Sequence, residues 1–119
     1  MVNRRGRGEL ESEVMAALWA AEGPMTAAGV QTVLGDGLAY NTVQTILIRL
    51  LEKGVVKRAP AGRGHAYWPV QDAATTAADR MRAALDGRPD RRAVLQQFAA
   101  GLDAVDASTL RSLLEERDS

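Results

Sequence analysis

A two-faced segment at residues 41–53 constrains the fold of this chain more than any other feature. Five apolar side chains recur there at helical spacing, and at about 100° per residue they fall on one side of a helix. These side chains are Val43, Ile46, Leu47, Leu50 and Leu51. Gly54 follows directly, and glycine commonly ends a helix in the left-handed conformation. The segment is therefore predicted to be a helix that buries this stripe against a core.

The other side of this predicted helix is polar and mostly uncharged. It carries Asn41, Thr45, Ile48 and Glu52, flanked by Thr42, Gln44 and Arg49. A helix face that is merely solvated usually carries more Lys and Glu, whereas short amide and hydroxyl side chains can hydrogen-bond base edges in the major groove. The pattern favours a DNA-recognition helix. The side chains predicted to contact DNA from it are Asn41, Thr42, Gln44, Thr45 and Arg49.

A basic β-hairpin is predicted to follow this helix. Residues 55–58 and 65–70 are rich in β-branched and aromatic side chains, and they flank a Gly/Pro-rich stretch at 59–64. Basic side chains around the helix and hairpin are spaced to meet phosphates, which position a protein on DNA without reading its sequence. His65 is interpreted as a strand residue near DNA, not as a catalytic base or metal ligand. The further residues predicted to contact DNA are Lys53, Arg63 and His65.

Two more helices are predicted before the recognition helix. Residues 9–21 carry apolar side chains at helical spacing, and Thr26 is a good N-cap for a second helix with Val30, Val33 and Leu34 inward. Three helices and then a basic hairpin form the element order of a winged helix-turn-helix. We predict this DNA-binding domain at residues 9–70, after a flexible basic arm at residues 1–8.

The last part of the chain, residues 71–119, is predicted to be a helical dimerisation region. Asp72, Asp90 and Asp106 are placed to begin three short helices. Their apolar faces are too thin for a core of their own, and leaving them exposed would create an unusually large apolar patch. The fold class is thus mainly α with a small β-hairpin wing. The side chains predicted at the dimer interface are Leu85, Val94, Leu95, Phe98, Leu102, Leu110, Leu113 and Leu114.

Composition excludes several kinds of chemistry. The chain has 119 residues, no Cys and a single His, so disulfides and thiolate metal sites are ruled out. No catalytic motif or phosphate-binding loop occurs, and we expect no enzyme activity, metal or cofactor. The formal net charge is zero, so bulk charge does not argue for DNA binding. With no signal peptide pattern and no apolar run near the ~20 residues that span a bilayer, we expect a cytoplasmic protein without a membrane partner.

Three blocks of sequence resemble the penicillinase repressor family, the BlaI/MecI type. They are residues 8–15 with Leu18-Trp19, residues 40–47 with Arg49-Leu50 and Lys53-Gly54, and residues 64–69. The resemblance implies a homodimeric transcriptional repressor on a dyad-symmetric operator in double-stranded DNA, often near genes for β-lactam resistance or another stress. It also implies operator contacts at Asn41, Thr42, Thr45 and Arg49, and a dimer formed by the C-terminal helices. The alternative is a winged-helix module that binds proteins and not DNA.

The sequence departs from the family at three places. Asn41 and Gln44 stand where the family often has Lys or Arg, so its operator preference does not carry over. Some members are inactivated by a protease between Asn and Phe, and the matching bond here is Gln97–Phe98. Because Gln97 replaces the Asn, we favour a role for Phe98 in the dimer core over cleavage. The Cys-x-Cys tail of a copper-responsive branch is absent.

Overall fold

The chain divides into two compact units, and the boundary falls between Ala77 and Ala78. The computed structural model describes residues 6–35 and 37–119. Residues 1–5, most of the predicted basic arm, lie outside the described residues. The last part of that arm is helical, because α1 spans Arg7–Ala20 and thus begins two residues before the expected start.

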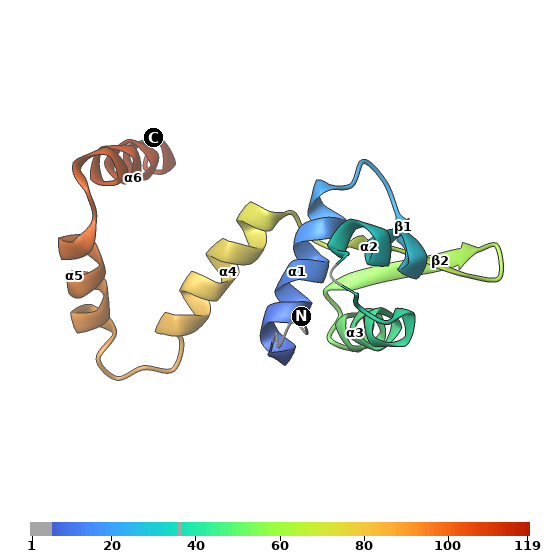
Figure 1. Cartoon of the computed structure of the whole chain (residues 1–119). Helices are drawn as coiled ribbons and strands as arrows, with labels where there is room; N and C mark the ends of the chain where they lie inside the picture. The colour runs from blue at the N-terminus through green and yellow to red at the C-terminus, as the bar shows by residue number, and fades with distance from the viewer. Residues whose placement is uncertain (1–5, 36) are drawn as a thin grey trace. The chain divides into compact units, whose positions relative to one another are not determined.

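The first unit begins with three helices (Figure 1). After α1 come α2 (Ala27–Leu34) and α3 (Tyr40–Glu52). The predicted cap of α2 is confirmed, since the Thr26 hydroxyl accepts a hydrogen bond from the backbone N–H of Gly29 at 3.1 Å. Gly35 ends α2 with φ at 59°, in the left-handed region that glycine adopts without strain. These two signals mark the start and the end of α2, and α1, α2 and α3 pack against one another.

The hairpin is longer than predicted and belongs to a three-stranded antiparallel sheet. Strand β2 spans Val56–Ala61, β3 spans Gly64–Pro69, and a two-residue β1, Met25–Thr26, pairs with β3. The sheet order is β1-β3-β2. Most of the stretch predicted as a turn, 59–64, is paired strand, and only two residues connect the strands. Pro60 fits because β2 is an edge strand, where a missing N–H is tolerated.

One hydrophobic core joins the three helices to the sheet. Its most deeply buried side chains are Leu47, Val14, Val30, Val43 and Val56. The predicted stripe of α3 is confirmed in Val43, Ile46, Leu47 and Leu50, whereas Leu51 is only half-buried. Val33 was predicted to point inward, and this is wrong: it is 61% exposed. The eight-residue α2 makes only about two turns, and its core-facing side is filled by Ala27 and Val30.

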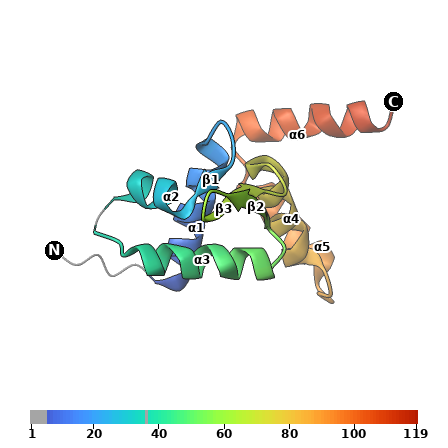
Figure 2. The ribbon, with the colours of Figure 1, turned by 90° about the vertical axis from the view of Figure 1, so that its right-hand side faces the viewer.

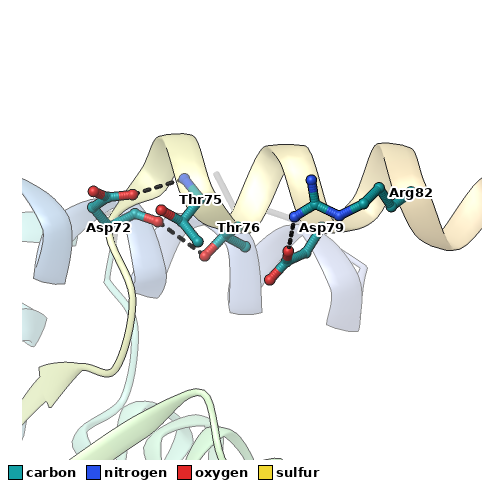
Figure 3. Close-up of polar contacts among 5 residues, drawn as sticks. All are labelled: Asp72, Thr75, Thr76, Asp79 and Arg82. Atoms are coloured by element: carbon teal, nitrogen blue, oxygen red, sulfur yellow. Dashed lines mark hydrogen bonds and ion pairs between the residues drawn. The ribbon is translucent and has the colours of Figure 1, made fainter. Parts of the chain in front are cut away.

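The C-terminal helices are α4 (Ala73–Leu85), α5 (Arg91–Gly101) and α6 (Ala104–Arg117). Figure 3 shows that the Asp72 carboxylate caps α4 by accepting the backbone N–H of Thr75 at 2.7 Å. Hydrogen bonding to Thr75 lowers the pKa of Asp72, and the side chain of Thr75 contributes more to this than its backbone. One turn later Arg82 pairs with Asp79 on the exposed side.

Asp90 is the N-cap residue of α5, as predicted, whereas the cap predicted for α6 is wrong. The Asp90 carboxylate makes no hydrogen bond to the first turn of α5 and instead pairs with Arg88 at 2.9 Å, which lowers the pKa of Asp90. The cap of α6 is Asp103, which accepts the N–H of Asp106 at 2.7 Å. Two acidic residues three positions apart can each cap the start of a helix, and the first of them does so here. Asp106 then sits in the first turn, where its charge suits the helix dipole.

The structure describes all of residues 73–117, and within this range no side chain of α4, α5 or α6 is buried. Leu85, Val94 and Leu102 are half-buried. The other predicted interface side chains, Leu95, Phe98, Leu110, Leu113 and Leu114, are exposed. None of the helices in the described part of the chain is long and apolar enough to cross a membrane.

Candidate nucleic-acid interface

The outward side of α3 carries the side chains that the sequence pattern placed there. Figure 2 shows α3 running along the edge of the winged-helix unit, with the sheet and α2 on its other side. Asn41, Gln44, Thr45 and Ile48 are exposed, and Thr42 and Arg49 are half-buried at the flank. The four core residues of α3 point away from them. The helix therefore presents a free polar face of the kind that fits a major groove.

Four of the predicted DNA contacts meet in a shallow hollow beside α1. Asn41, Thr42, Thr45 and Arg49 line it together with Leu10 and Ile46, and its volume is about 350 Å³. Gln44 lies on the opposite flank of α3 and is not part of the lining. Leu10 was not among the predicted site residues, because its place here depends on how α1 packs on α3, and no local pattern reveals this.

Hydrogen bonding inside α3 restricts what these side chains can offer a base. The Thr45 hydroxyl donates to the backbone oxygen of Asn41 at 2.9 Å. Its oxygen remains an acceptor and its methyl group remains free, but its proton is used. The Asn41 carboxamide makes no hydrogen bond to the part of the chain that the structure describes. Asn41 therefore keeps both a donor and an acceptor, the pair that reads adenine in the major groove.

Lys53, predicted to meet a phosphate, is already engaged within the domain. Its ammonium lies 2.7 Å from the Glu11 carboxylate, which links the end of α3 to α1. The two residues are 42 positions apart, so no local sequence pattern predicts this pair. A phosphate contact by Lys53 would compete with Glu11. By contrast, Arg49, Lys57 and Arg63 form no ion pair with any described residue.

The remaining predicted residues, Arg63 and His65, lie in the β2–β3 hairpin that forms the wing. Arg63 lies in the two-residue turn between β2 and β3, next to Gly62 with φ at 61°. His65 is half-buried, and its ring lies 6.5 Å from that of Tyr67 at an interplanar angle of 59°. Because residues two apart share a face of a strand, His65 lies on the same side of the sheet as the buried Tyr67. Arg58, paired across from Tyr67, donates to its hydroxyl at 3.2 Å.

Three helices, a free polar face on the third and a basic hairpin define a winged-helix DNA-binding protein. A solved structure of the ferric uptake regulator Fur of Helicobacter pylori shares this fold, with a TM-score of 0.52 and 14% identity over 57% of this chain and 49% of that one. MarR of Escherichia coli in its oxidized form aligns over 93% of this chain and 75% of its own, at 22% identity and a TM-score of 0.47.

Sequence comparison defines the family. The model of the penicillinase repressor family matches residues 7–116. The transcriptional regulator BlaI of Mycobacterium tuberculosis (strain CDC 1551 / Oshkosh) is 36% identical over 117 residues, covering 94% of this chain and 85% of that protein. The chain belongs to the penicillinase repressor family. It is a transcriptional regulator with a winged-helix domain and not an enzyme, as the sequence predicted.

Proposed function

We propose that the protein is a homodimeric repressor in which the α3 of each protomer reads one half of a dyad-symmetric operator. The free polar face of α3 carries this proposal, because the Asn41 carboxamide and the acceptor oxygen of the Thr45 hydroxyl stay available there. Asn41, Thr45 and Gln44 are assigned to base edges. Thr42, Arg49 and Arg63 are assigned to phosphates, with His65 beside the backbone at the wing.

The exposed apolar side chains of the C-terminal helices support the homodimer. Leucines and a phenylalanine that stay exposed on α5 and α6 need a partner surface, and a second copy supplies the same surface by two-fold symmetry. Two recognition helices also specify more base pairs than one, which a regulator needs among many competing genomic sites. The proposed interface is made of Leu85, Val94, Leu95, Phe98, Leu102, Leu110, Leu113 and Leu114.

The regulated genes are proposed to belong to β-lactam resistance or another stress response, because the relative named above is a BlaI regulator. The protein would act on chromosomal DNA in the cytoplasm. Cleavage at Gln97–Phe98 is not part of the proposal. That bond lies inside α5, so a protease would reach it only after the helix opened, and Gln97 stands where the cleaved relatives have Asn.

The reading face is tested by Thr45→Ala, measured on an operator recovered by genome-wide footprinting and on random duplex DNA. We expect operator affinity to fall by about 1 kcal/mol, roughly fivefold, with little change on random DNA. Thr32→Ala is the matched control, since Thr32 is also an exposed helical Thr whose hydroxyl donates four residues back, at 3.0 Å to Ala28.

Equal losses on both DNAs would refute the assignment of Thr45 to base reading. The alternative function, a winged-helix module that binds proteins, predicts a different outcome for binding to duplex DNA. It would not bind duplex DNA with the steep loss of affinity at rising salt that phosphate contacts produce.

A further inference from the structure

A second hollow lies on the winged-helix unit, lined by other residues than the α3 site. It has a volume of about 540 Å³ and is formed by the end of α1, the turn after it, and the end of β3. Both tryptophans of the chain, Trp19 and Trp68, line it together with Pro24 and Pro69. Its size falls in the range of small-molecule sites, which are mostly apolar with a few polar groups.

The ring of Trp19 is held in place by a hydrogen bond. Its Nε1 donates to the backbone oxygen of Gln71 at 2.8 Å, and an indole has no other polar hydrogen to give. The part of the ring that lines the hollow therefore offers π surface and not a hydrogen-bond donor. Such a surface carries a negative quadrupole and attracts cations as well as apolar groups.

The charges around this hollow have one sign. Glu22 and Asp72 are among its lining residues, and none of the lining residues, all in the described part of the chain, is Lys, Arg or His. The Asp72 carboxylate is fixed by the N–H of Thr75 at 2.7 Å. Lys57 pairs across from Trp68 on the hairpin but does not line the hollow. A ligand there meets two carboxylates and two indoles.

We propose that this hollow binds a small organic cation with apolar substituents, such as an aromatic quaternary ammonium ion. The apolar groups pack on the tryptophans and prolines, and the positive charge faces the indoles and the carboxylates of Glu22 and Asp72. A neutral ligand of the same shape loses the charge interactions, and an anion meets repulsion from both carboxylates. The site does not depend on the proposed DNA contacts.

The test uses the full chain without DNA and three probes: phenyltrimethylammonium, its neutral isostere tert-butylbenzene, and benzenesulfonate. The indole N–H signals of Trp19 and Trp68 in a ¹H–¹⁵N NMR spectrum report directly on the hollow, because the chain has no other tryptophan. We expect the cation to shift both signals in a saturable way, and to bind about tenfold more tightly than the neutral isostere. Benzenesulfonate should shift neither signal.

A double variant, Glu22→Gln with Asp72→Asn, separates the charges from the shape. Both changes are nearly isosteric, and Asn still caps a helix well, so α4 keeps its start. Affinity for phenyltrimethylammonium should fall about fivefold, while Glu116→Gln with Asp118→Asn, which removes the same charge from residues that do not line the hollow, should leave it unchanged. Equal binding of cation and isostere, equal binding to both double variants, or no shift with any probe would each overturn the proposal. If the native chain bound the cation as expected but did not bind an operator, only the proposed function would be overturned.

Discussion

The winged-helix unit and the C-terminal helices differ in how far they bury their apolar side chains. Every buried hydrophobic residue of the described chain lies between Val14 and Tyr67. Helices α4, α5 and α6 make up just under a third of the chain and bury none. The first region has a core of its own, and the second has apolar faces that remain open. The first region therefore has a complete core within a single chain, whereas the second region does not.

The reason lies in where the large apolar side chains occur. In the winged-helix unit, three helices and a sheet converge, so a side chain such as Leu47 is enclosed from several directions. The C-terminal helices carry many alanines between their leucines, and alanine buries little area. Phe98 stays 44% exposed as a result. In the proposed homodimer, a second copy supplies the missing layer for these helices.

The largest expected effect of a single truncation is in the core. Leu47→Ala should lower the free energy of unfolding of the winged-helix unit by about 2–5 kcal/mol, because it removes a fully enclosed side chain and leaves a cavity. Denaturant unfolding followed by tryptophan fluorescence measures this directly, since Trp19 and Trp68 both lie in that unit. The midpoint should not depend on the protein concentration.

Leu113→Ala makes the same chemical change in the other region. Leu113 is 54% exposed in a single protomer, so its truncation should leave the fluorescence transition of a monomeric winged-helix unit unchanged. It should instead weaken dimerisation about tenfold or more, from the apolar area lost at the interface. A large shift of the fluorescence midpoint that persists at low protein concentration would show that the two regions are not energetically separate.

The smallest expected effect is at the ion pair between α1 and α3. Lys53→Gln removes the partner of Glu11 and should cost about 0.2–1 kcal/mol of unfolding free energy, because Lys53 is 56% exposed and the pair is screened. The effect should vanish at high salt. Lys57→Gln is the control, since Lys57 has no ion-pair partner among the described residues. A loss that does not respond to salt would mean that packing, and not charge, joins the two helices there.

The parts of the fold that follow from local pattern were predictable. The stripe of α3, the Thr26 cap and the element order depend on side chains within a few positions of each other. The polar outward face of α3 followed from the same periodicity, because burial of one side leaves the other side free. Four of its predicted site residues meet in one hollow for this reason.

The features that sequence reasoning missed depend on distant partners or on competing local signals. Strand β1 exists only because Met25 and Thr26 pair with Tyr67 and Ala66. The Glu11–Lys53 pair and the place of Leu10 require α1 to pack on α3. The α6 cap was misassigned because two acidic residues stand three apart, and only the backbone shows which one precedes the first turn. Long-range packing, not propensity, decides such details.

In the proposed dimer, the C-terminal helices join two winged-helix units on one operator. Sedimentation of Phe98→Asp at micromolar concentration tests it most directly, with Ala100→Asp on the opposite side of α5 as the control. We predict a dimer for the native chain and for Ala100→Asp, and a folded monomer with much weaker operator affinity for Phe98→Asp. An intact Phe98→Asp dimer, or a monomeric native chain that binds the operator as tightly as before, would contradict the claim.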